Sequence, residues 1–120
     1  MMKVIYAYTR KQALEDGVLV DAGEMAKEAG FKFPVAITAA AWEQYVEVPQ
    51  GAECQDEQGR LWDILYMLHI AILKDGGRDQ VDFSLYVNND GKAKPVYLKA
   101  ICGPGDDAEP VITIMLPHED

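Results

Sequence analysis

The sequence predicts an α+β fold, in which a C-terminal antiparallel sheet of three to four strands packs against one long helix. Two patterns predict it. Apolar residues recur every three or four positions between residues 57 and 74, and they alternate with polar residues between 81 and 87. The chain has 120 residues, the common size of one domain, and 49% of them are hydrophobic, enough for a core. We therefore expect a single domain over residues 1–120, without disulfide or metal staples.

The N-terminal elements are predicted to be short. Residues 4–8 are rich in strand-forming side chains. Thr9 follows them, and Gln12 three positions later completes a capping box, so a helix is expected over residues 10–15. Residues 18–20 are a brief apolar run and are expected to be extended.

Two further short helices are expected before the long one. Asp21 and Glu24 repeat the capping-box pattern, and Gly30 is suited to end the helix that follows. Thr38 has the side chain of a helix cap and is expected to start a third helix that runs to about Val46.

The long helix is expected over residues 57–74, ending before a pair of glycines. Its apolar positions have the spacing that builds one buried face. They are Leu61, Ile64, Leu65, Leu68 and Ile72. We expect Leu65 and Leu68 to be core residues.

The last third of the chain predicts a three-stranded meander. Residues 81–87 have the period-two pattern of a half-buried strand, and the Asn- and Gly-rich segment 88–91 suits a hairpin turn. A partner strand is expected over 95–102 and a third over 111–116, joined by a loop at 103–110. The long helix should cover this sheet.

The charge of the chain argues against two classes of partner. Twenty acidic residues against eleven basic ones give a net charge of −9, and no basic patch is visible, so we expect no direct binding of nucleic acid or of anionic membranes. No apolar stretch approaches the roughly 20 residues of a membrane-spanning helix. Charged Arg10 comes too early for a secretory signal, which predicts a cytoplasmic protein.

Two stretches of the chain carry an excess of acids. Arg60 is the one base between residues 43 and 63, and no Lys or Arg follows Lys99. We expect the 103–110 loop to expose its carboxylates at its tip, where they would be surplus to the fold and available to a basic partner. The candidate binding residues from the two stretches are Asp106, Asp107, Glu109, Glu43, Glu47, Asp56 and Glu57.

A second stripe on the long helix also suggests a binding surface. Trp62, Tyr66 and His69 follow one another at spacings of four and three residues, offset from the Leu/Ile face. A helix with two apolar faces is either packed between layers or uses one of them for a partner. Trp62 and Tyr66 are therefore candidate binding residues, and a homodimer through this face is one form that the contact could take.

No catalytic or metal-binding constellation is evident. Cys54, Cys102, His69 and His118 are each isolated, so the paired spacing of a zinc site is absent, and we expect no metal and no cofactor. Cys102 and His69 could meet in space as a nucleophile and its base, or each could be a packing or surface residue. The acids of the 103–110 loop could hold a divalent ion or simply be solvated. General acid–base catalysis by the acids of the first stretch would require one carboxyl group in a dry pocket. These acids are Glu43, Glu47, Asp56 and Glu57. The balance favours a non-enzymatic protein.

Several phrases of the sequence resemble a family of small uncharacterised bacterial proteins that are carried largely on plasmids, phages and integrative elements. This resemblance implies a setting rather than a mechanism, because it brings no catalytic residue. Small acidic proteins of mobile elements often bind and block host machinery, including restriction and CRISPR systems. The phrases that carry the resemblance lie at residues 5–13, 16–21, 29–35, 61–65 and 98–107.

Two hypotheses about function follow. The first is an acidic, non-enzymatic accessory protein of a mobile element that binds a protein partner and inhibits a host defence protein whose basic surface it complements. The second is a small-molecule or nucleotide-binding protein, or an enzyme, with its site between the 102–110 loop and the segment that contains Tyr6, Tyr8 and Arg10. A pocket with convergent polar groups would favour the second hypothesis, and an exposed acidic or aromatic surface the first.

Overall fold

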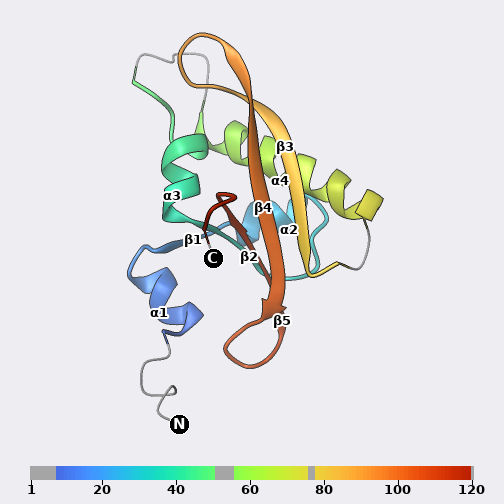
Figure 1. Cartoon of the computed structure of the whole chain (residues 1–120). Coiled ribbons are helices and arrows are strands. Elements are labelled where there is room, and N and C mark those ends of the chain that lie inside the picture. The colour runs from blue at the N-terminus through green and yellow to red at the C-terminus, as the bar shows by residue number, and fades with distance from the viewer. Residues whose placement is uncertain (1–7, 51–55, 76–77, 120) are drawn as a thin grey trace.

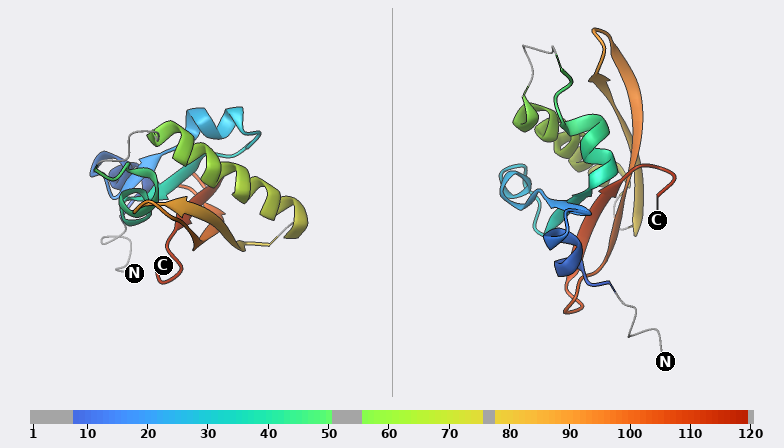
Figure 2. Two further views of the ribbon diagram at one scale, coloured as in Figure 1. Left: turned by 90° about the horizontal axis from the view of Figure 1, so that it is seen from above. Right: turned by 90° about the vertical axis from the view of Figure 1, so that its left-hand side faces the viewer.

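The computed structural model describes residues 8–50, 56–75 and 78–119, and it confirms the α+β class. A five-stranded sheet in the order β1-β2-β5-β4-β3 forms its centre (Figure 1). The long helix α4, Glu57–Asp75, lies across one face of the sheet, as the view from above also shows (Figure 2). The helix predicted over 57–74 is therefore confirmed.

The predicted C-terminal meander is also confirmed. It consists of β3 (Gln80–Asn88), β4 (Ala93–Pro104) and β5 (Pro110–Met115), paired antiparallel in that order. Burial alternates strictly along β3, because its apolar residues face α4 and its polar residues face away. The hairpin between β4 and β5 is longer than expected, since its pairing continues to Pro104 and Pro110, which leaves a tip of residues 105–109.

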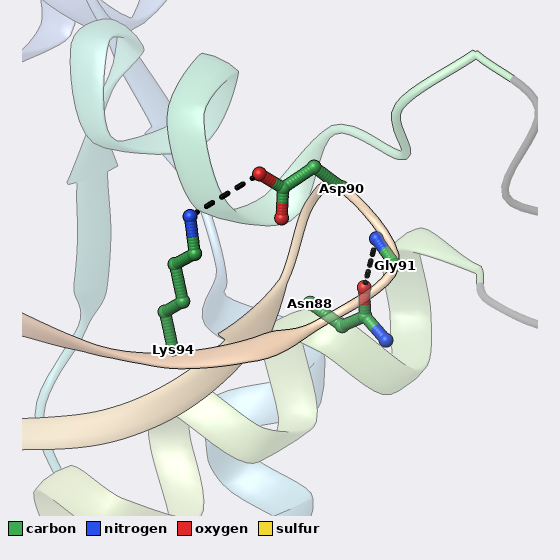
Figure 3. A network of polar contacts seen from close by, with 4 residues as sticks. All are labelled: Asn88, Asp90, Gly91 and Lys94. Atoms are coloured by element: carbon green, nitrogen blue, oxygen red, sulfur yellow. Dashed lines mark hydrogen bonds and ion pairs between the residues drawn. The ribbon is translucent and has the colours of Figure 1, made fainter.

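The turn between β3 and β4 has the chemistry that the sequence predicts. Gly91 adopts a φ of 88°, a conformation that glycine tolerates best. Its amide donates to Asn88 Oδ1 at 2.9 Å, and Lys94 Nζ lies 3.3 Å from Asp90 Oδ2 (Figure 3). These local contacts fix the register of the hairpin.

The predicted sheet was wrong in its size and in its strand directions. It has five strands rather than three or four, and it is mixed, because β2 (Val35–Thr38) pairs parallel with β5 and antiparallel with β1 (Leu19–Asp21). The sequence of β2 is Val-Ala-Ile-Thr, and its first three residues are buried. A strand covered on both faces lacks the alternation that reveals a half-buried strand, and its partner β5 is more than 70 residues away in the chain.

The short helices follow the predictions with one change. Helix α1, Arg10–Glu15, starts with the predicted capping box of Thr9 and Gln12. Helix α2, Gly23–Glu28, has Ala22 at its N-cap position instead of the predicted Asp21, whose carboxylate accepts from the Gly23 amide at 2.8 Å. The strand expected at residues 4–8 lies outside the described residues, apart from Tyr8, which belongs to no strand.

Thr38 caps the third helix as predicted. Its hydroxyl accepts from the amide of Ala41, and the helix starts as α3, Ala39–Ala41. It continues as the π-helical turn η2, Trp42–Val46, which the sequence did not predict. The end of the helix at Val46 agrees with the expectation.

The core lies between α4 and the sheet. Leu65 and Leu68 have no exposed surface, as predicted, and neither has Ile64. They pack in one cluster with the inward residues of the meander and of β2, among them Phe83, Leu98 and Ile37. Among the described residues, no helix is long and apolar enough to cross a membrane.

Candidate protein-binding surface

The predicted acidic residues do not form one surface. Asp106, Asp107 and Glu109 are exposed at the tip of the β4–β5 hairpin. Glu43 and Glu47 are exposed on and just after η2, near the β3–β4 turn, where they line a hollow with Asn89. The two groups therefore lie at opposite ends of β4 (Figure 1), separated by its 12 residues, about 40 Å of extended chain.

The carboxylate of Asp106 holds the start of α1. Its two oxygens accept hydrogen bonds from the amides of Arg10 at 2.8 Å and Lys11 at 3.0 Å. These are two of the amides that have no partner within the first turn of a helix. The backbone hydrogen bonds from Arg10 and Lys11 lower the pKa of Asp106 below its ordinary value. The expectation that the charges of this loop are surplus to the fold was therefore wrong for Asp106.

The side chain of Arg10 also holds α1 against β5. One guanidinium nitrogen donates to Thr113 Oγ1 at 2.7 Å and another to the carbonyl of Ile112 at 3.0 Å, both in β5. At the hairpin tip, Glu109 accepts from the amide of Asp107 at 2.9 Å. The structure thus brings together two segments proposed for a ligand site, but Arg10 and Asp106 are engaged in holding α1 to the hairpin. Tyr6 lies outside the described residues.

We expect Asp106→Ala to lower the melting temperature at neutral pH, because two helix amides lose their acceptor. The bound carboxylate has a folded-state pKa below the ordinary value of 3.8. Its contribution is therefore present above the unfolded-state pKa and is lost as the pH falls through the lower, folded-state pKa. Thermal unfolding between about pH 7 and pH 2.5 should show the difference between wild type and variant shrinking below about pH 4.

Asp107→Ala is the matched control for that experiment. Asp107 is a neighbouring exposed acid whose backbone amide, rather than its carboxylate, is hydrogen-bonded. It should leave the melting temperature nearly unchanged at every pH. Equal shifts for both variants would contradict the capping role of Asp106.

The other acidic pair of the sequence prediction also has a structural role. Asp56 precedes the first residue of α4, and its Oδ1 accepts from the amide of Gly59 at 2.6 Å, which is the contact of a helix cap. Glu57 is exposed in the first turn, where a negative charge is favourable. These two residues stabilise the helix terminus, so neither requires a partner to explain its charge.

Arg60 is turned inward and joins three elements. Only 7% of its surface is exposed, and burial lowers the pKa of its guanidinium. It donates from α4 to the carbonyl of Tyr45 at 3.1 Å, to the carbonyl of Asn88 at 3.0 Å and to Asn89 Oδ1 at 2.5 Å. Arg60 thereby fixes the position of the β3–β4 turn relative to α4 and η2.

A groove follows the outer side of β3, the last strand of the sheet. It consists of two hollows of about 510 and 240 Å³ that share Asp63, Leu85 and Tyr86. One side comes from α4 and η2, and the other from β3 and β4, which provide inward-facing Leu85 and Val87 as well as outward-facing Tyr86 and Tyr97. We call this the edge groove, and its residues are Tyr45, Arg60, Asp63, Tyr66, Met67, Ser84, Leu85, Tyr86, Val87, Asn88, Ala93, Pro95 and Tyr97.

Exposed tyrosines surround the edge groove. The exposed fraction is 52% for Tyr66, 71% for Tyr86 and 64% for Tyr97. Trp62, one helical turn before Tyr66, is 38% exposed. Large aromatic side chains left in solvent around one hollow are typical of a protein-binding surface.

The sequence prediction found part of this surface. Tyr66 and Trp62 are exposed, whereas His69 on the same stripe packs edge to face against Phe31, with ring centroids 5.7 Å apart. Tyr86 and Tyr97 were missed because they stand at polar-face positions of their strands and lie 11 residues apart. A signal was present, since a tyrosine at an outward position of a half-buried strand is exposed by the strand pattern itself.

His69 does not line the cavity that contains Cys102. Cys102 lines this mostly apolar cavity of about 230 Å³ with Phe33, Ile72, Arg78, Asp79, Val81, Ala100 and Ile112. No hydrogen bond joins Cys102 to His69 in the part of the chain that the structure describes. Among those residues no three of His, Cys, Asp and Glu come together as metal ligands would. Cys54 lies outside the described residues.

Comparisons with curated proteins and with solved structures found no match to this chain. Its sequence does match a family of unknown function, DUF6573, over residues 1–120. The match covers every element described above, including the edge groove and the docked α1. The chain therefore belongs to the family of unknown function DUF6573.

Proposed function

We propose that this protein is a non-enzymatic binding protein that engages a protein partner through the edge groove. The observation that carries the proposal is the gathering of Tyr66, Tyr86 and Tyr97, each more than half exposed, around one groove. Aromatic side chains contribute the most binding energy where they can be buried by a partner, and tyrosine is enriched at such positions. Asp63, which lines both hollows, and the net charge of −9 would favour a partner with basic residues.

We further propose that this protein is an accessory protein of a mobile genetic element and that it acts in the cytosol. The net charge of −9 supports an inhibitory role, because an acidic protein can occupy the basic surface with which a host defence protein binds nucleic acid. The resemblance to proteins carried on plasmids and phages supports the same setting. The free thiol of Cys102 is compatible with a reducing compartment.

The test is to measure partner binding by a Tyr66→Ala/Tyr86→Ala double variant. A partner captured from the native host is purified, and its affinity for each form is measured by calorimetry. We expect the double variant to bind at least about tenfold more weakly, because two aromatic contacts are lost. Val18→Ala is the matched control, since Val18 is 50% exposed but adjoins β1 at the opposite edge of the sheet, and it should bind like wild type.

An unchanged affinity of the double variant, with Val18→Ala also unchanged, would exclude the edge groove as the binding surface. Sedimentation at several protein concentrations examines the homodimer form of the proposal. In that form Trp62 and Tyr66 would meet their counterparts in a second copy. A dimer that Trp62→Ala dissociates would make the second copy the partner, while a monomer at every concentration would exclude it.

The cavity at Cys102 supports a second candidate, a site for a small ligand. Its volume of about 230 Å³ is below the usual range of roughly 300–1,000 Å³ for ligand pockets. Its lining is apolar except for Arg78 and Asp79, so a small apolar group would fit it better than a nucleotide. Mass spectrometry of the native protein would reveal a co-purified ligand. Replacing Ala100 with Leu should displace such a ligand without changing partner binding at the edge groove.

A further inference from the structure

β3 is an edge strand without the features that normally protect such an edge. It is nine residues long, its pairing with β4 is continuous without a bulge, and its other side pairs with no strand in the described part of the chain. It contains no Pro, Lys or Arg, and Asp82 is its one charged residue. Long, unbulged edge strands with few charges pair readily with another strand. The opposite edge, β1, has only three residues.

The backbone groups that face the free side of β3 can be identified from two hydrogen bonds. The amide of Cys102 donates to the carbonyl of Asp79 at 2.7 Å, so Asp79 and every second residue after it turn their backbone groups toward β4. The residues between them turn theirs outward, and the carbonyl of Asn88 accordingly accepts from Arg60 of α4. The amides and carbonyls of three of these residues therefore point away from β4, toward the free edge of the sheet. The residues are Asp82, Ser84 and Tyr86.

The edge groove lies beside these outward groups. α4 provides Tyr66 and Met67 on one side, and the outer face of the sheet provides Tyr86 and Tyr97 on the other. A strand added to β3 would point its side chains alternately to these two sides. When an extended peptide adds to an edge strand beside a helix, main-chain hydrogen bonds supply affinity and side-chain contacts supply specificity.

We propose that β3 binds an extended segment of a protein partner as an added strand, in which apolar residues alternate with basic ones. This inference rests on the proposed function and specifies its mode of binding. The apolar residues would contact Met67 and Leu85 on the α4 side, beside Asp63, and the basic ones would approach Tyr86, Tyr97 and the carboxylate of Asp82 on the outer face. A second copy is disfavoured as the occupant, because it would bring these acids together between two chains of charge −9.

The first test uses a synthetic peptide of about nine residues, the length of β3, with Val alternating with Lys or Arg. Two further versions carry N-methyl groups, one on all Val residues and one on all basic residues. In an added strand, every second residue directs its amide toward β3, and the residues between them direct theirs away. Methylation of the residues that face β3 should therefore weaken binding at least about tenfold, and methylation of the others should leave the affinity unchanged. Equal affinities of all three peptides, or no binding up to about 1 mM, would overturn the inference.

The second test is amide hydrogen exchange of the protein with and without the parent peptide. Exchange at the outward residues Asp82, Ser84 and Tyr86 should slow by at least about tenfold at saturation. Phe83 and Leu85 already bond to β4 and should change much less. Uniform slowing along β3, or none, would contradict strand addition. Both measurements use the unaltered protein and so do not depend on the folding of a variant.

A backbone variant connects the two levels of the proposal. Ser84→Pro removes one outward amide without removing a bond to β4, and it should weaken peptide binding by at least about tenfold if circular dichroism shows a folded protein. If Ser84→Pro and the methylated peptides all bind normally, while Tyr66→Ala/Tyr86→Ala weakens binding, the edge groove binds its partner in another way. If the double variant has no effect on the native partner, the proposed function itself is wrong.

Discussion

Replacing Leu65 or Leu68 with Ala is expected to lower the free energy of unfolding by about 2 to 5 kcal/mol. Both side chains are completely buried between α4 and the sheet, where each truncation would remove apolar contacts and leave a cavity. The core around them includes Ile64, Phe83 and Leu98 from three different elements, and such a site closes poorly around a cavity. The loss would be a large part of the stability of a domain of this size.

Urea unfolding of the purified variants measures this effect. Leu73→Ala is the matched control, because it is the same substitution on the same helix at a position that is 73% exposed. It should change the free energy of unfolding by no more than about 0.5 kcal/mol. If Leu65→Ala and Leu68→Ala both unfold at the urea midpoint of the wild type, the packing of α4 on the sheet described above is wrong.

Replacing Arg60 with Ala is expected to cost about 2 to 4 kcal/mol, the second largest effect. The guanidinium donates to the carbonyls of Tyr45 and Asn88 and to the side chain of Asn89. Without it these part-buried hydrogen bonds are lost, together with the packing of a side chain that is only 7% exposed. The β3–β4 turn would also lose its hydrogen bonds to α4, and the bond from Asn89 to the carbonyl of Gln44 at 2.9 Å would be left to hold it to η2.

The measurement is again urea unfolding, together with amide exchange at residues 88–91. Arg60→Lys keeps the charge but not the fork of donors, so it should recover only part of the loss. Arg78→Ala removes an exposed arginine and should cost no more than about 0.5 kcal/mol. If Arg60→Ala is as stable as Arg78→Ala, the three hydrogen bonds do not contribute to the fold. Weaker partner binding by Arg60→Ala would show that the edge groove needs this turn held in place.

The candidate site was predictable only in part, and the reasons differ between residues. Tyr66 and Trp62 were found because a helix places residues at spacings of three and four on one side. The acidic residues were found as charge clusters, but charge alone does not distinguish a helix cap from a binding residue. Asp56 caps a helix that starts one residue later, and Asp106 caps one that starts 96 residues earlier. The second contact could not be read from local sequence.

The sequence by itself determined most of the local elements of this protein, and the tertiary structure decided how they assemble. Capping residues, turn residues and hydrophobic periodicity act over a few positions, so α1, α4 and the β3–β4–β5 meander could be predicted. The parallel pairing of β2 with β5, the contact of Asp106 with α1 and the edge groove each join segments that are distant in the chain. Their formation depends on the packing of whole elements, for which a run such as Val-Ala-Ile-Thr has no local signature.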